Sequence, residues 1–81
     1  MKLTAEMSLY PLNAEFKPII QSFIDTLLKR DGVEVIRNPL STQVSGEYDQ
    51  VFQLVQETLA ASTDRFGKQV LVVKFIVGEF G

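Results

Sequence analysis

The stretch that decides the fold is residues 3–10, Leu-Thr-Ala-Glu-Met-Ser-Leu-Tyr, in which apolar and polar side chains alternate. Successive side chains of a strand point to opposite faces, so this period of two predicts a strand over residues 2–10 with one buried face and one open face. Pro11 is expected to end the strand, because proline has no N–H for a sheet ladder. The predicted buried face carries Leu3, Ala5, Met7 and Leu9.

Two later segments have the spacing of helices. Apolar residues recur every three or four positions between Phe16 and Arg30, which predicts a helix over residues 15–30. Gly32 follows and is expected to cap this helix in a left-handed conformation. The same spacing returns after Tyr48 and stops near Gly67, which predicts a second helix over residues 49–65.

Three short runs rich in β-branched residues complete the pattern and predict strands over residues 33–38, 42–47 and 70–77. The expected order is βαββαβ, which favours an α+β, ferredoxin-like sandwich: a four-stranded antiparallel sheet with two helices on one face. Right-handed crossovers place the first and third strands in the centre, the fourth beside the first and the second beside the third. The predicted core consists of Leu3, Met7, Phe16, Ile20, Phe23, Ile24, Leu27, Val44, Phe52, Val55, Leu59, Val73 and Phe75.

Size and composition narrow the possible functions. With 81 residues the chain has room for one small domain, residues 1–81. It carries a net charge of −2 and no long basic run, so we expect no nucleic-acid binding. The sequence has no Cys and no His, which removes thiol and imidazole catalysis and most metal ligation; we therefore expect no metal site, no cofactor and no catalytic residues. Neither a signal peptide nor a membrane span is visible, so the expected location is the cytoplasm, without membrane insertion.

The open face of the predicted sheet is half polar and half apolar, which suits a partner or a ligand. Glu6 and Lys74 would lie on adjacent strands of this face, where a cross-strand ion pair is expected. Val72 and Ile76 would leave apolar surface open to water, and a chain this small is marginally stable alone. Both observations predict a homodimer or homotetramer.

Hydroxyl and amide groups converge where the first strand ends beside the start of the third. Ser8 and Tyr10 lie at the end of the first strand, and Thr42 and Gln43 lie at the start of the third. A few polar groups beside an aromatic face are the usual means of binding a small polar ring compound. The alternative is an ordinary hydrated sheet surface, and the parity of Thr42 with Val44 points Thr42 toward the helices unless the strand begins after it.

Three segments resemble the YkoF-like family of thiamine-binding and hydroxymethylpyrimidine-binding proteins. They are residues 6–12, Glu-Met-Ser-Leu-Tyr-Pro-Leu, residues 39–52 with the run Ser-Thr-Gln-Val-Ser-Gly, and residues 75–78, Phe-Ile-Val-Gly. The resemblance implies a non-enzymatic protein that binds thiamine, or its hydroxymethylpyrimidine part, in a pocket at the sheet face and the oligomer interface, in vitamin transport or salvage. It would place Ser8, Tyr10 and Thr42 nearest the ligand, with Glu6 as a supporting acceptor and Gln43 beside it.

Two other functions are open on the sequence. The same face could serve only self-association, which would make the chain a structural or regulatory module without a small-molecule ligand. An acylphosphatase-like enzyme on this fold is disfavoured, because residues 11–13, Pro-Leu-Asn, supply neither the glycine-rich anion cradle nor the nearby arginine that such an enzyme needs.

Overall fold

The computed structural model describes residues 1–78 and contains four strands and two helices in the predicted order. The elements are β1 (Lys2–Pro11), α1 (Phe16–Leu28), β2 (Glu34–Arg37), β3 (Thr42–Glu47), α2 (Tyr48–Phe66) and β4 (Gln69–Val77). Each boundary lies within two residues of the sequence prediction. The expected ferredoxin-like α+β fold is confirmed.

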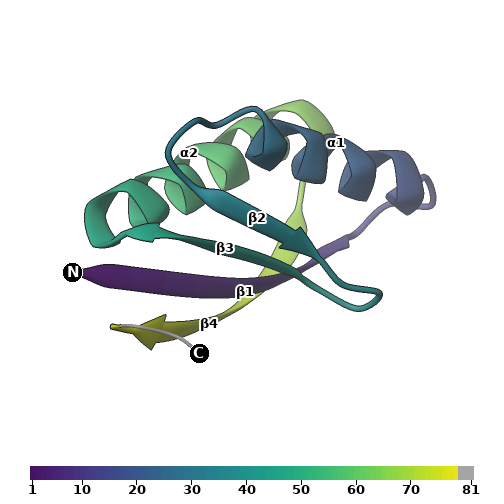
Figure 1. The fold of residues 1–81 in the computed structure, drawn as a ribbon. Helices are drawn as coiled ribbons and strands as arrows, with labels where there is room; N and C mark the ends of the chain where they lie inside the picture. The colour runs from purple at the N-terminus through teal and green to yellow at the C-terminus, as the bar shows by residue number, and fades with distance from the viewer. Residues whose placement is uncertain (79–81) are drawn as a thin grey trace.

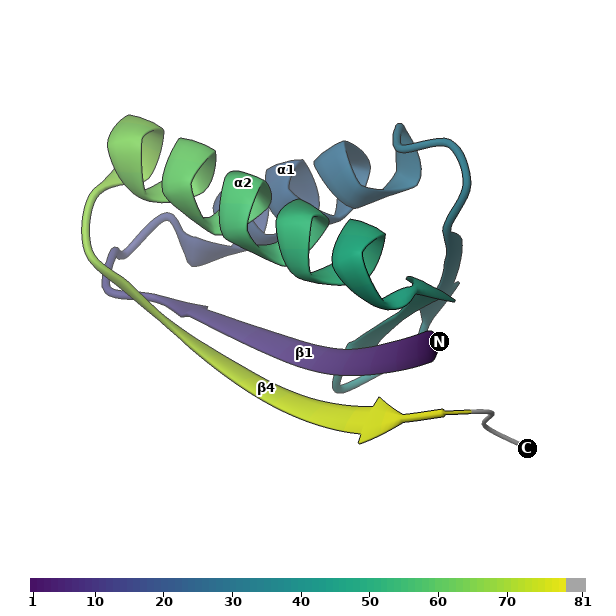
Figure 2. The same cartoon turned by 90° about the vertical axis from the view of Figure 1, so that its left-hand side faces the viewer.

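The four strands form one antiparallel sheet in the order β2-β3-β1-β4, which places β1 and β3 in the centre as predicted. Both helices lie on the same side of this sheet (Figures 1 and 2). The strand β1 pairs with β4 along nearly its whole length, from Leu3 opposite Val77 to Pro11 opposite Gln69, without a bulge. Its pairing with β3 is shorter and stops at Met7 opposite Thr42.

The alternation in β1 has the predicted consequence. Its odd-numbered residues 3–9 are all buried under the helices. The helices contribute Ile19, Phe23 and Leu27 from α1 and Val51, Leu54 and Val55 from α2. These side chains and Val44 of β3 form one continuous apolar core.

Three phenylalanines predicted in the core are instead exposed, and this part of the prediction is wrong. They are Phe16, Phe52 and Phe75. Phe16 is the first residue of α1, and the buried residues of this helix begin at Ile19. Phe52 and Phe75 stack on each other with ring centroids 4.6 Å apart, at the margin where α2 passes the edge strand β4. Two helices cover the centre of a four-stranded sheet better than its edges, so apolar periodicity overestimates burial there.

The other predicted core residues divide between the interior and its rim. Leu3, Met7, Phe23, Leu27, Val44 and Val55 are buried, whereas Ile20, Ile24, Leu59 and Val73 are half-buried. The buried stripe of α2 also includes Thr58 and Ser62. Gln69 at the start of β4 donates its side-chain amide to the Ser62 hydroxyl over 2.9 Å, which attaches β4 to α2.

The two helices end differently. At α2, Gly67 adopts φ +88° and its N–H donates to the carbonyl of Thr63 over 2.8 Å, which satisfies an orphan carbonyl of the last turn. At α1 the helix already ends at Leu28 with Lys29 as its C-cap. Gly32 does have φ +85°, but it lies in the turn before β2 and does not cap α1 as predicted.

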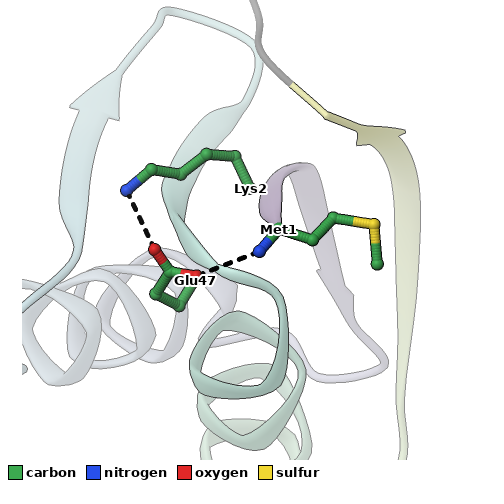
Figure 3. Close-up of polar contacts among 3 residues, drawn as sticks. All are labelled: Met1, Lys2 and Glu47. Carbon is green, nitrogen blue, oxygen red and sulfur yellow. Dashed lines mark hydrogen bonds and ion pairs between the residues drawn. The ribbon is translucent and has the colours of Figure 1, made fainter.

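A charge cluster closes the end of the sheet where the chain begins (Figure 3). The Glu47 carboxylate accepts from the Lys2 ammonium and from the α-amino group of Met1, each over 3.3 Å. The Lys2 hydrogen bond, followed by the α-amino group, holds the pKa of Glu47 below its ordinary value of 4.5. Beside it the Tyr48 N–H donates to the Met1 carbonyl over 2.8 Å, so β1 is tied to the first turn of α2.

The core predicts a contrast between two adjacent leucines of α1. Leu27 is fully buried and Leu28 is 50% exposed. We expect Leu27→Ala to lower the free energy of unfolding by about 2 to 5 kcal/mol, because it removes buried methyl groups and leaves a cavity. The control Leu28→Ala should change it by less than about 1 kcal/mol. Urea denaturation followed by circular dichroism measures both, and equal losses would contradict the packing described here.

The Glu47 cluster predicts a pH dependence. A carboxyl whose pKa is lower in the folded state contributes stability above its unfolded pKa and loses that contribution as the pH falls through the folded value. Wild type should therefore melt at a slightly higher temperature than Glu47→Gln at neutral pH, and the difference should vanish in acid below the ordinary glutamate range. High salt should reduce the same difference at neutral pH, because the group is exposed. A difference that stayed constant with pH and salt would rule out this ion-pair cluster as its source.

Candidate functional site: a cavity at the end of β1

The candidate site arises because β1 is longer than β3. Past Met7, β1 continues through residues 8–11 with β4 on one side and no strand on the other. The connection between β2 and β3, residues 38–41, turns away at this point, and the N-terminal half of α1 passes above. The space between them is a cavity of about 510 Å³.

The cavity walls are mostly apolar, with a few polar groups. The end of β1 contributes residues 7–11, α1 contributes Phe16, Ile20, Phe23 and Ile24, and the β2–β3 connection contributes residues 38–41 together with Thr42. No charged side chain is among these lining residues, all of which lie in the described range 1–78. Apolar walls with a small number of directed polar groups are the usual form of a site for a small organic molecule.

Hydrogen bonds from β1 hold the 38–41 turn that forms one wall. The Asn38 N–H donates to the Ser41 carbonyl over 2.8 Å and closes the turn. The Ser8 hydroxyl donates to the Leu40 carbonyl over 3.1 Å, and the Ser41 hydroxyl donates to the Glu6 carboxylate over 3.2 Å. Two side chains on the open face of β1 thus fix the position of this wall.

Glu6 itself does not line the cavity. It lies directly opposite Lys74 in the β1–β4 register, as predicted, but the ion pairs formed within residues 1–78 do not include this one. The same Glu6 oxygen that accepts from Ser41 also lies 3.5 Å from the Gln43 amide nitrogen. The carboxylate is therefore turned toward β3 and away from Lys74, so the expected cross-strand ion pair is absent.

Thr42 illustrates the side-chain parity that the sequence left open. The strand β3 begins at Thr42, which pairs with Met7, so its side chain faces the helices and is buried. Among residues 1–78 its hydroxyl has no hydrogen-bond partner, although it lines the cavity. The buried side-chain atoms without a partner in this range do not include it, so the hydroxyl is accessible from the cavity and available to a ligand.

Of the residues predicted for the site, the structure brings Ser8, Tyr10 and Thr42 together in the cavity lining and leaves Glu6 and Gln43 outside it, on the open sheet face. Sequence reasoning missed the contributions of α1 and of the 38–41 turn. Phe16 was assigned to the core because of its helical spacing, whereas it is an exposed aromatic side chain of the cavity lining. Its position as the first residue of the helix was the available signal, since the first buried residue of α1 is Ile19, one turn later.

Within residues 1–78, no three acidic side chains come close enough to hold a metal ion. Neither helix in this range has the length and apolar character needed to cross a bilayer.

This arrangement defines a class of protein: a ferredoxin-like α+β protein with a cavity at the end of its central strand β1 and no charged side chain in the cavity lining. A family model described as "Thiamine-binding protein" matches residues 5–75. The chain therefore belongs to the thiamine-binding protein family, which confirms the resemblance drawn from the sequence, and this membership supports a thiamine-binding role. No curated protein matches the chain.

Solved structures share the fold. Protein SP2199 from Streptococcus pneumoniae is similar with a TM-score of 0.89 and 25% identity, over 98% of this chain and 89% of that one. TM0486 from Thermotoga maritima, a proposed thiamine biosynthesis/salvage protein, is similar with a TM-score of 0.81 and 19% identity, over 93% of this chain and 82% of that one. A domain of unknown function from Bacillus cereus has a TM-score of 0.79 and 17% identity, over 96% and 77% of the two chains. The last two likenesses concern the fold alone.

Proposed function

We propose that the chain binds thiamine, or its hydroxymethylpyrimidine part, in the cavity at the end of β1, and that it does so without catalysis, in vitamin transport or salvage. The observation that carries the proposal is an uncharged, mostly apolar cavity whose few polar groups include the unpartnered hydroxyl of Thr42, in a chain of the thiamine-binding family. Tyr10 is the only titratable side chain in the lining, so a general acid and base pair is not assembled there within residues 1–78.

The chemistry of the cavity suits an aminopyrimidine ring. The flat ring can lie against the exposed aromatic side chain of Phe16, and Tyr10 of β1 also lines the cavity. When the ring leaves water, its nitrogen atoms need hydrogen-bond donors and acceptors from the protein. The hydroxyls of Ser8 and Thr42 can supply them. Glu6 supports the site indirectly, by holding Ser41 of the cavity wall.

The first test compares two buried threonines. Thr42→Val should weaken thiamine binding roughly five- to 150-fold, because a buried polar ligand group loses a partner worth about 1 to 3 kcal/mol. Thr58→Val is the matched control: Thr58 is also a buried threonine whose hydroxyl has no partner within residues 1–78, but it lies in α2 and does not line this cavity. Isothermal titration calorimetry of wild type and both variants measures the effect.

Ser8→Ala should weaken binding by a similar factor, since it removes both a cavity hydroxyl and a tie of the 38–41 turn. Ser45→Ala on the neighbouring strand, outside the cavity lining, should have no effect on binding. If neither cavity variant changed the titration, the site would lie elsewhere. If wild type gave no heat with thiamine or hydroxymethylpyrimidine, the chain would act as a self-association module without a small-molecule ligand.

The open sheet face supports assembly into a homodimer or homotetramer. Val70, Val72 and Ile76 of β4 and Ile36 of β2 are exposed, and their side chains share the face opposite the helices. Burying apolar surface is worth roughly 25 cal/mol per Å², so covering this face with a second copy of the chain would stabilise both. An assembly through this face would also bring a neighbouring chain close to Ser8 and Tyr10.

Light scattering tests the assembly. Wild type at micromolar concentration should show a multiple of the 9.1 kDa chain mass, and Val72→Asp should shift the distribution toward one chain, because a carboxylate buried in an apolar contact is costly. Leu28→Asp is the control: Leu28 is 50% exposed and Val72 46%, but Leu28 lies on the helical layer. A single-chain mass for wild type would contradict the assembly proposal.

A further inference from the structure

The direction of the backbone groups along β1 follows from three hydrogen bonds at its ends. The Lys2 carbonyl accepts from Gly78 over 2.7 Å and the Leu12 N–H donates to Lys68 over 3.1 Å, both on the β4 side. The Met1 carbonyl accepts from Tyr48, on the β3 side. In an antiparallel sheet the N–H and C=O of one residue point to the same side, and the side alternates along the strand. Because the β1–β4 register is continuous, even-numbered residues face β4 and odd-numbered residues face β3.

Leu9 is the first odd-numbered residue of β1 beyond the end of the pairing with β3. The β1–β3 register stops at Met7 opposite Thr42, and its continuation would place Leu40 opposite Leu9. Leu40 has instead turned outward and is 89% exposed, and its carbonyl is taken by the Ser8 hydroxyl. Within residues 1–78, the backbone hydrogen bonds outside the regular ladders include none of Leu9.

The unpaired groups of Leu9 therefore face the cavity, which Leu9 lines. Leu9 is also a mostly buried residue, with 8% of its surface exposed. Buried backbone N–H and C=O groups are almost always paired, and a strand edge without a partner invites one. The next odd-numbered residue is Pro11, which has a carbonyl but no N–H. Leu9 is thus the one residue of this open edge, residues 8–11, that offers both a donor and an acceptor.

We infer that the backbone N–H and C=O of Leu9 form the recognition edge of the cavity and pair with the adjacent ring nitrogen and exocyclic amine of an aminopyrimidine. The inference rests on the proposed function and adds the orientation of the ligand. The ring nitrogen accepts from the Leu9 N–H, and the amine donates to the Leu9 carbonyl. The ligand thereby takes the place of the missing stretch of β3, in the way that peptides add to an open sheet edge.

This pairing makes the site selective for a ligand that places an acceptor opposite the Leu9 N–H and a donor opposite the Leu9 carbonyl. Oxythiamine carries a carbonyl oxygen where thiamine has the exocyclic amine, and its neighbouring ring nitrogen carries a hydrogen. It would present an acceptor to the Leu9 carbonyl and a donor to the Leu9 N–H, so both contacts become repulsive. A site that reads hydrogen bonds discriminates strongly against a ligand that leaves its buried polar groups unpaired.

Competition calorimetry with thiamine and oxythiamine gives the first readout. Oxythiamine should bind about 10- to 100-fold more weakly than thiamine. Equal affinities would overturn the Leu9 pairing and leave the proposed function standing, because thiamine would still be bound in the cavity. Failure of both compounds to bind would overturn the pairing and the proposed function together.

Nuclear magnetic resonance locates the contact on the backbone. In protein labelled with ¹⁵N-leucine, addition of hydroxymethylpyrimidine should shift the Leu9 amide proton and slow its exchange with solvent. Leu3 is the control, because its odd position also faces β3 but it has Gly46 opposite it. If the Leu9 amide were unmoved while the ligand bound, or moved no more than that of Leu3, the assignment would be wrong.

Discussion

The structure depends on β1 keeping its alternation without a bulge from one end to the other. Its continuous register with β4 means that every odd-numbered side chain from Leu3 to Leu9 enters the core and every even-numbered one faces the open side. A shift of one residue would exchange the two sets and place Glu6 and Ser8 under the helices. The core, the polar groups that hold the cavity wall and the apolar open face are therefore all consequences of one strand's phase.

The unequal lengths of the two central strands create the candidate site. Because β3 starts at Thr42, the last part of β1 has a partner on one side only. The turn at residues 38–41 would be free to fold over this gap or away from it, and the bonds from Ser8 and to Glu6 hold it as a wall. Polar side chains on the open face of β1 thus hold the 38–41 turn and determine the shape of the cavity at the end of β1. Glu6 acts by positioning, whereas Thr42 reaches the cavity directly.

The helical layer leaves two margins of the molecule incompletely covered, and they differ in chemistry. At the first turn of α1, the exposed ring of Phe16 adds to the cavity. Along β4, the stacked rings of Phe52 and Phe75 lie on the helical side of the sheet, and Val72 and Ile76 lie on the open side, with Lys74 between them. The first margin suits a small ring compound and the second suits another copy of the chain. Ligand binding and assembly would then use neighbouring surfaces of the same sheet.

The sequence by itself determined the element order, the strand order and the faces of β1, because these follow from local periodicity and from the handedness of crossovers. It also brought Ser8, Tyr10 and Thr42 into one neighbourhood, because antiparallel pairing of β1 and β3 requires it. It overestimated the burial of Phe52 and Phe75, since periodicity does not tell how far a helix extends over a sheet edge. Only the tertiary structure decided that Glu6 turns toward Ser41 and away from Lys74, that Phe16 lines a cavity, and that the backbone of Leu9 faces it unpaired. These outcomes depend on where β3 begins relative to β1 and on the path of a turn, which are set by contacts between segments more than thirty residues apart in the chain.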